Sequence, residues 1–230
     1  MKVAIIQYPG SNCDLDAKRY FGGDFVFHKE HVLYGKYDLI VIPGGFAFGD
    51  RIYTKATGHY QISPGQQAIE SSVTKIILAA HEKNIPILGI CNGFQILIKL
   101  GLLPGKLECN EDGKFHSKNV KCVFQENKVY DVYRKYEIPI ANKYGRYIGD
   151  PKDAFLTYTD YDSEIAGVRN GNVFGMMPHP ERLPNNLDLK HRLFNMIFNY
   201  TVPDYDIKRI MYHIKVPKSI SKIYILKATM

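Results

Sequence analysis

Four uninterrupted apolar runs, each closed by a turn containing glycine or proline, restrict this chain to few folds. The runs are "KVAIIQ" (2–7), "DLIVIPGG" (38–45), "IPILGI" (85–90) and "NVFGMM" (172–177). Runs that do not alternate with polar residues are typical of strands covered on both faces, as in a parallel sheet between helices. The sequence therefore predicts an α/β fold with an open, mostly parallel sheet flanked by helices on both faces, in a flavodoxin-like layering.

Helical periodicity places one amphipathic helix between the second and third runs and another near residue 200. The first is marked by Ile69, Val73, Ile76, Ile77 and Ala80. The second carries a stripe of Leu189, Leu193, Ile197 and Tyr200, and Pro203 ends it. The stretch 106–170 is less regular and indicates shorter strands and loops. We therefore predict one domain over residues 1–201 and a separate extension over residues 202–230.

The extension holds most of the positive charge. The formal net charge is +7, and residues 202–230 contain six lysines and arginines against two aspartates, which leaves +4 there and +3 on residues 1–201. Such a segment suits a partner-binding arm, a strand-like extension or a nucleic-acid contact. A solvated tail without a separate function is the simpler interpretation, because arginine is scarce and no recognised nucleic-acid fold is visible. We predict no nucleic-acid partner.

Membrane insertion and disulfide chemistry are not expected. No apolar stretch is long enough to span a membrane, and the apolar start of the chain is too short for a signal peptide. The four cysteines form no close pair, which disfavours a zinc ribbon or a dithiol redox motif and indicates reduced thiols. We expect a cytoplasmic protein with no membrane partner.

Residues 85–101 join a buried strand to an apolar helix through Gly89, Cys91 and Gly93. This arrangement is typical of a nucleophile elbow, in which glycines relieve crowding on either side of the nucleophile. A helix N-terminus favours the thiolate of Cys91, and the N–H of Asn92 faces the same space as one half of an oxyanion hole. On position alone, a buried packing cysteine is the better interpretation, because free cysteine is among the most buried residue types, so other residues must decide.

The segment "MMPHPERL" (176–183) offers a base and a residue to orient it. In an extended backbone restricted by Pro180, His179 and Glu181 project to similar sides, so that the carboxylate can accept the second N–H of the imidazole. The segment follows a buried strand, as Cys91 does, and the carboxyl ends of such strands form ligand sites. We predict a triad of Cys91, His179 and Glu181. A surface-turn histidine between prolines is the alternative.

A glycine-rich loop, Gly44 to Gly49, follows the second apolar run. It lacks the Gly-Lys-Ser/Thr of a phosphate-binding loop and the spacing of the dinucleotide fingerprint. We predict that Gly44 and Gly45 offer N–H groups to an oxyanion, with Gly45 as the second donor, although a plain turn stays open. No metal site is predicted, because His28 and His31 have no third ligand in view.

Taken in this order, the elbow, the Gly-Gly loop and His-Pro-Glu resemble a class I glutamine amidotransferase. The G-x-C-x-G-x-Q elbow and distant His-x-Glu of that class are matched by Gly89, Cys91, Gly93, Gln95, His179 and Glu181. Within the class, the resemblance is strongest to the glutaminase subunits of phosphoribosylformylglycinamidine synthase, in purine biosynthesis. The segments that narrow it are "QYPGSNCD" (7–14), "IPGGFAFGD" (42–50), "GICNGFQIL" (89–97), "GLLPG" (101–105), "IAGV" (165–168) and "GNVFGMMPHPERL" (171–183).

The resemblance implies a glutaminase that serves a larger enzyme. Cys91 attacks the carboxamide of L-glutamine, His179 protonates the departing ammonia and Gln95 contacts the α-amino or carboxylate end of glutamine. Ammonia then passes to a synthetase subunit that binds ATP, with magnesium, and formylglycinamide ribonucleotide, usually beside a small third subunit. The chain itself is expected to hold no cofactor and to hydrolyse glutamine poorly without that partner.

Two departures and two rival functions stay open. The usual His-Gly-Glu-Gly of the family is Asn142-Lys143-Tyr144-Gly145 here, which puts a contact or pocket-wall role of that segment in doubt, and residues 202–230 have no family counterpart. The first rival is a glutaminase subunit of a different synthetase. The second is a non-catalytic thiol sensor or binding module of the same fold, which would leave the His-Pro-Glu pair unexplained.

Overall fold

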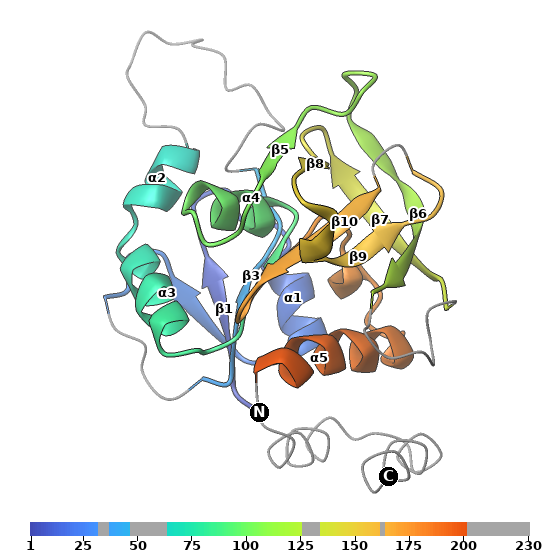
Figure 1. Ribbon diagram of the computed structural model, residues 1–230. Coiled ribbons are helices and arrows are strands. Elements are labelled where there is room, and N and C mark those ends of the chain that lie inside the picture. Colours follow the sequence, from blue (N-terminus) through green and yellow to red (C-terminus); the bar gives the residue numbers. More distant parts are fainter. Residues whose placement is uncertain (32–36, 47–63, 126–133, 162–163, 202–230) are drawn as a thin grey trace, which may run out of the picture.

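A nine-stranded sheet forms the centre of the molecule (Figure 1). The computed structural model describes residues 1–31, 37–46, 64–125, 134–161 and 164–201. The strand order is β2-β1-β3-β4-β11-β10-β9-β6-β7, and a separate two-stranded sheet pairs β5 with β8. The predicted α/β class is therefore confirmed, and the large sheet is mixed, with a parallel half and an antiparallel half.

The parallel half contains the four predicted strands and one further edge strand. It consists of β2 (Asp24–Phe27), β1 (Val3–Gln7), β3 (Leu39–Ile42), β4 (Ile87–Ile90) and β11 (Val173–Met176), each parallel to its neighbour. All residues of β3, β4 and β11 are buried, which explains why their sequences are continuously apolar. In chain order these strands follow the flavodoxin-like pattern 2-1-3-4-5, whose ligands bind beyond the carboxyl ends of the strands.

Helices cover both faces of the parallel half, as predicted (Figure 1). On one face lie α1 (Asp14–Phe21) and α5 (Leu187–Thr201), which touch through the rings of Phe21 and Phe194, 5.8 Å apart between centroids. On the other lie α2 (Pro64–Glu70), α3 (Ser72–Glu82) and α4 (Asn92–Lys99). The stripe predicted for the last helix is buried at Leu189, Leu193 and Ile197, because it packs onto the core.

The single helix predicted between β3 and β4 is wrong, because two helices occupy that region. Ser71 adopts an extended backbone (φ −65°, ψ 143°) between α2 and α3, and its hydroxyl donates to the carbonyl of Gln67. A serine side chain that bonds to the backbone competes with helix continuation. The predicted apolar face survives on α3, where Val73, Ile77 and Ala80 are buried.

The antiparallel half comes from the stretch predicted to hold short strands. It consists of β10 (Ile165–Asn170), β9 (Ala154–Tyr158), β6 (His116–Phe124) and β7 (Tyr136–Asn142). The small sheet pairs β5 (Lys106–Glu108) with β8 (Arg146–Ile148). Two single 3-10 turns, η1 (Pro151–Asp153) and η2 (Pro180–Arg182), complete the described elements.

The structure bears only in part on the predictions about membrane insertion, the C-terminal extension and the glycine-rich loop. Within the described residues, no helix has the length and apolar character needed to cross a membrane. The 202–230 extension lies outside the described residues, and so do residues 47–49 of the glycine-rich loop. The domain boundary at residue 201 therefore stays a prediction.

Candidate active site

Four strands of the parallel half deliver their following turns to one edge of the sheet. Cys13 comes after β1, Gly44 after β3, Cys91 after β4 and His179 after β11. Because parallel strands end on the same side, residues far apart in the chain meet there. An alanine-like Cβ built on Gly44 would lie 2.7 Å from Cε1 of His179 and 3.2 Å from Sγ of Cys13, which shows how closely these turns pack.

Cys91 occupies the strained turn predicted for a nucleophile elbow. Its backbone has φ 50° and ψ −103°, a left-handed region that residues other than glycine seldom adopt. Its N–H donates to the carbonyl of Met176 (2.7 Å), which ties β4 to β11 at the turn. A Cβ at Gly93 would lie 2.0 Å from the carbonyl oxygen of Ile42, and one at Gly89 would lie 2.6 Å from the backbone of Gly93. The turn therefore requires both glycines.

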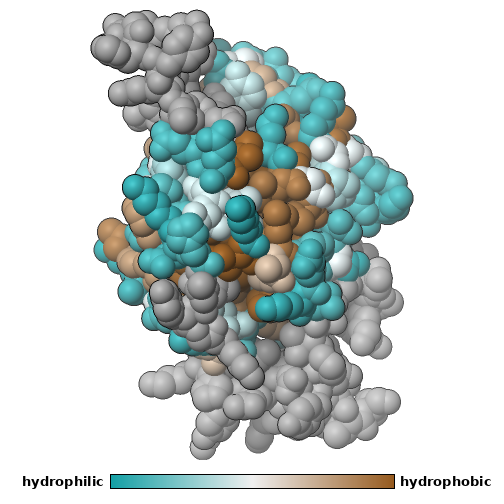
Figure 2. All heavy atoms as spheres, turned by 90° about the vertical axis from the view of Figure 1, so that its left-hand side faces the viewer, coloured by the Kyte–Doolittle hydropathy of each residue, from teal (hydrophilic) through white to brown (hydrophobic). Residues whose placement is uncertain are grey.

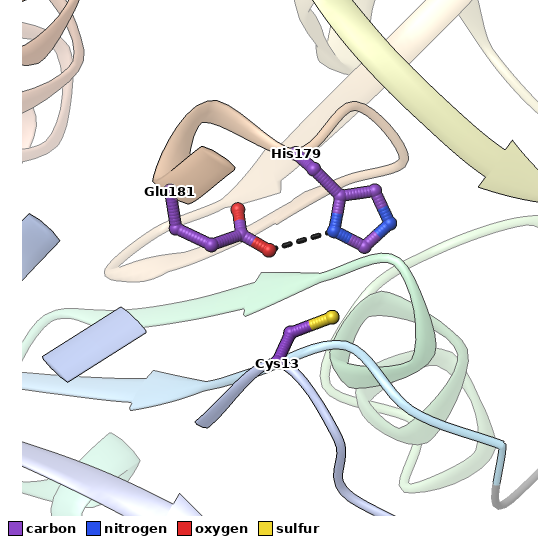
Figure 3. A group of neighbouring side chains, drawn as sticks. All are labelled: Cys13, His179 and Glu181. Carbon is purple, nitrogen blue, oxygen red and sulfur yellow. Dashed lines mark hydrogen bonds and ion pairs between the residues drawn. The ribbon is translucent and has the colours of Figure 1, made fainter. Parts of the chain in front are cut away.

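His179 and Glu181 form a buried pair. Nδ1 of the imidazole and Oε1 of the carboxylate are 2.6 Å apart, and each residue is only 1% exposed (Figure 3). The predicted extended backbone is wrong: residues 180–182 form the η2 turn, and His179 (φ −104°, ψ 80°) caps it. The pair still forms, because the turn folds the Glu181 side chain back towards the ring.

Charge around His179 favours the imidazolium form. Burial lowers the pKa of His179, but the charges of Glu181 and then Cys91 outweigh it, and the pKa lies well above its usual range. Nε2 of the ring is buried and forms no hydrogen bond with any of the described residues. One nitrogen of the imidazole is thus held by a carboxylate, and the other has no partner among the described residues.

The Gly44-Gly45 turn lies beside the base, and its predicted role as an oxyanion donor stays a prediction. The carbonyl of Gly44 accepts from the N–H groups of Asn12 and Cys13 (3.2 Å each), and Ser11 forms an antiparallel bridge with Gly45. A Cβ at Gly45 would lie 2.3 Å from the carbonyl oxygen of Gly10. The glycines therefore let two strand ends approach closely, which the loop pattern alone did not indicate.

Asn92 and Gln95 are buried and bonded to each other. Nδ2 of Asn92 donates to Oε1 of Gln95 (2.9 Å), and Nε2 of Gln95 donates to the carbonyl of Tyr144 (3.0 Å). Both ends of the Gln95 amide are thus engaged with protein groups. A direct contact of Gln95 with a substrate stays a prediction, and what the geometry adds is that Gln95 fixes the segment around Tyr144.

The C-terminal end of β7 forms a wall of this site. The carbonyl of Pro139 accepts from the N–H of His179 (2.8 Å), and the carbonyl of Ala141 accepts from the thiol of Cys91 (3.6 Å). The next residue, Asn142, is fully buried and begins the segment that departs from the family pattern. These contacts come from backbone carbonyls before the departing segment Asn142-Lys143-Tyr144-Gly145, whose contact or pocket-wall role stays open.

Sequence reasoning missed Cys13 and Arg182. The sulfur of Cys13, one atom of His179 and one of Glu181 all lie within 4.8 Å of one another (Figure 3). Nη2 of Arg182 donates to that sulfur at 3.4 Å. The available signal was the position of Cys13, which follows a buried strand just as Cys91 and His179 do. Cys, His and Glu are ligand types for zinc. A cation between them is disfavoured, because a guanidinium already contacts the sulfur and the His179–Glu181 hydrogen bond occupies the other two groups.

His28 and His31, discounted above as metal ligands, do not lie in this cluster. Nδ1 of His28 pairs with the hydroxyl of Ser71 at 3.3 Å. In the part of the chain that the structure describes, the one group of ligand-type side chains close enough to share an ion is Cys13, His179 and Glu181.

Comparison with known proteins places this geometry in a family. Residues 1–158 match the model of the CobB/CobQ-like glutamine amidotransferase domain. The phosphoribosylformylglycinamidine synthase subunit PurQ of Pseudothermotoga lettingae is 39% identical and covers 81% of this chain and 89% of its own. The protein of the same name from Thermotoga maritima is 37% identical and covers 86% of this chain and 97% of its own.

Solved structures agree at the level of the fold. A chain of the PurLQS structure from Thermotoga maritima superposes with a TM-score of 0.70 at 38% identity, covering 86% of this chain and 98% of that one. A second crystal structure, of a glutamine amidotransferase, superposes with a TM-score of 0.60 at 17% identity, covering 86% of this chain and 98% of that one, and shows the fold alone.

Proposed function

The chain belongs to the CobB/CobQ-like glutamine amidotransferase family, and on that premise we propose that it is the glutaminase subunit of a phosphoribosylformylglycinamidine synthase. It is thus a class I glutamine amidotransferase, an enzyme that takes nitrogen from L-glutamine. The observation that carries the proposal is the strained turn at Cys91 beside the buried His179–Glu181 pair. The curated relatives, 37% and 39% identical over most of the chain, support the choice of synthase.

In the proposed reaction, the thiolate of Cys91 attacks the side-chain carboxamide carbon of glutamine. The N–H groups near Gly45 and Asn92 stabilise the oxyanion of the tetrahedral intermediate. The His179 imidazolium gives its proton to the departing nitrogen, the C–N bond breaks and ammonia leaves a thioester on Cys91. His179 then takes a proton from water, which attacks the thioester and releases glutamate.

Glu181 holds His179 in the orientation that this sequence of steps needs. Its carboxylate binds Nδ1, so Nε2 is the nitrogen that exchanges protons with the reacting groups. The charge of Glu181 also favours the imidazolium before ammonia departs. Glu181 is buried and lies in the η2 turn, so water does not compete for the hydrogen bond that orients the ring.

We propose that a synthetase subunit receives the ammonia and holds ATP and magnesium, while this chain holds no cofactor. The similar chain from Thermotoga maritima comes from a structure of PurLQS, and the curated relatives are named as subunits of a synthase. The face of the molecule formed by α2 and α3 shows a central band of hydrophobic residues bordered by hydrophilic ones (Figure 2). Leu78 of α3 is 38% exposed, and apolar surface of this kind is typical of contacts with another protein. A third small subunit and a cytoplasmic location stay predictions.

Reconstitution with the synthetase tests the proposal directly. Cys91→Ala is expected to abolish product formation from glutamine, at least about 1,000-fold, because the nucleophile is gone. Product formation from added ammonia is expected to stay within about twofold of wild type, because the synthetase does not use Cys91. Cys109→Ser serves as the matched thiol control. Loss of both activities, or of neither, would contradict the proposal.

Covalent labelling separates this function from a thiol sensor of the same fold. A glutamine-like electrophile such as a diazo-ketone analogue is expected to modify Cys91 selectively, and free glutamine is expected to protect it. A sensor thiol would react without such protection. A glutaminase for a different synthetase would give protected labelling but no formylglycinamidine ribonucleotide in the reconstituted assay.

A further inference from the structure

Cys13 is a second thiol held against the proposed base. It is 2% exposed, it caps the N-terminus of α1, and its sulfur faces the Nδ1 and Cε1 side of His179 (Figure 3). Gly44 packs on the same side, where a Cβ would lie 3.2 Å from the sulfur and 3.4 Å from Nδ1 of His179. The ring of His179 is therefore confined between a carboxylate, a sulfur and a glycine backbone.

The surroundings of Cys13 are more polar than those of a packing cysteine. Nη2 of Arg182 donates to the sulfur at 3.4 Å, and the thiol lies 3.2 Å from Oδ1 of Asn12. Cys122, by contrast, is a packing cysteine whose pKa is raised strongly by burial. Arg182, Asn12 and the N-terminus of α1 thus surround the Cys13 sulfur with polar groups.

The contacts of Cys13 are placed so that they act on the orientation and charge of His179 and leave its reacting nitrogen free. The sulfur lies on the side of the ring that binds Glu181, whereas Nε2 is directed elsewhere. Burial lowers the pKa of His179, the charges of Glu181 and Cys91 raise it, and the Cys13 sulfur beside the ring raises it further. Arg182 is also joined to the base through its backbone, because its N–H donates to the carbonyl of His179 (3.3 Å).

We propose that Cys13, held by Arg182, is a positioning residue that fixes the imidazole of His179 and supports its protonated state. The inference rests on the proposed function, in which His179 delivers a proton to ammonia and then accepts one from water. Cys13 itself forms no covalent bond to substrate in this scheme.

Two substitutions and one control test the proposal in the full-length chain. Cys13→Ala removes the sulfur, Cys13→Ser keeps a smaller hydrogen-bonding group for Arg182, and Cys109→Ser removes a thiol outside the cluster. Two measurements are made on each. Glutaminase kinetics are recorded in the complex with the synthetase, and the titration of His179 is followed by NMR of chain labelled with 15N-histidine.

We expect Cys13→Ala to lower kcat about tenfold with KM for glutamine within about twofold, as when a hydrogen bond to a charged group is lost. The His179 titration is expected to move to lower pH, because a group that favours the imidazolium is gone. Cys13→Ser should recover part of both effects, and Cys109→Ser should match wild type. If Cys13→Ala fails to fold, the change that Cys13→Ser causes in the His179 titration tests the proposal alone.

An unchanged His179 titration in the Cys13 variants would overturn the proposal, even if kcat or the unfolding temperature fell, because Cys13 would then act only through packing. The titration needs no turnover of glutamine. A wild-type complex without glutaminase activity would therefore sink the proposed function while the NMR result still decided the effect of Cys13 on His179.

Discussion

The imidazole of His179 shows how burial and charge compete at a single residue. Burial alone would keep it neutral, but the carboxylate of Glu181 at 2.6 Å and the nearby Cys91 favour the charged form. A proton donor for departing ammonia must be charged before the reaction and neutral after it. In the proposed reaction Glu181 favours the charged form of His179, and the carboxylate stays beside the imidazole because both residues are buried.

Replacing that partner is the sharpest residue-scale prediction. Glu181→Gln is expected to lower glutaminase kcat at least about 100-fold, because the imidazole loses both its orientation and the charge that keeps it protonated. The pKa of His179 is expected to fall, so the imidazolium should be lost at a lower pH and the alkaline limit of activity should move to lower pH. The exposed Glu137→Gln on β7 is the control and should retain activity. A kcat within about threefold of wild type would show that Glu181 is not the orienting group.

The same substitution predicts a pH dependence of stability. The pKa of His179 is raised above its ordinary 6.5, so its contribution to the free energy of unfolding is complete below about pH 6.5 and is lost as the pH rises through the folded-state pKa. Glu181→Gln should therefore destabilise the protein most at pH 6, by about 1–3 kcal/mol, and less at high pH. Urea unfolding of both proteins at several pH values measures this. A difference that grows with pH would contradict it.

At the scale of elements, the β4–α4 turn depends on glycines that touch backbone and not flexible side chains. Gly93 lies in the first turn of α4, where alanine would ordinarily favour the helix by about 1 kcal/mol. Here its Cβ would lie 2.0 Å from the carbonyl oxygen of Ile42, in the neighbouring strand β3. Helix propensity thus predicts that Gly93→Ala raises the free energy of unfolding, whereas tertiary packing predicts that it lowers it.

We expect packing to win, so that Gly93→Ala lowers the free energy of unfolding by at least about 2 kcal/mol. Gly101→Ala is the matched control at the other end of α4. It has open space around its Cα but a φ of +73°, so it should cost only about 1–2 kcal/mol. Midpoints of urea unfolding compare the two. Gly93→Ala as stable as wild type would mean that β3 moves freely away from α4.

Elements differ in how much of them the sequence predicts. The strands β1, β3, β4 and β11 were predicted because burial on both faces leaves a continuous apolar run. The break at Ser71 was not, because a serine at that spacing is also compatible with a continuous helix. The order of β10, β9, β6 and β7 depends on pairings between segments up to tens of residues apart, which short, half-exposed strands do not encode locally.

At the scale of the whole molecule, the side chains of the proposed triad lie beneath the surface. Cys91 is 2% exposed and its thiol contacts the carbonyl of Ala141 on β7, so in the proposed reaction protein contacts must be displaced before glutamine reaches the thiol. A partner subunit that binds this chain can supply the free energy for that change.

We therefore predict that the isolated chain hydrolyses glutamine at least about tenfold more slowly than the chain bound to its synthetase, which corresponds to about 1.4 kcal/mol of coupling. Glutamate formation with and without the synthetase measures the difference, and Cys91→Ala with the synthetase gives the background. Equal rates in the presence and absence of the partner would show that the site is already competent.

By itself, the sequence determined which residues make up the proposed triad and the elbow at Cys91, although it did not predict the η2 turn. The Gly89-Ile90-Cys91-Asn92-Gly93 elbow and the His179–Glu181 pair are local, so residue type and spacing within a few positions specify them. Only the tertiary structure decided which other groups meet them. Arg182 reaches Cys13 across 169 residues of chain, and the carbonyls of Pro139 and Ala141 come from β7 in the other half of the sheet. Those contacts follow from strand order, a property of long-range pairing that no local pattern records.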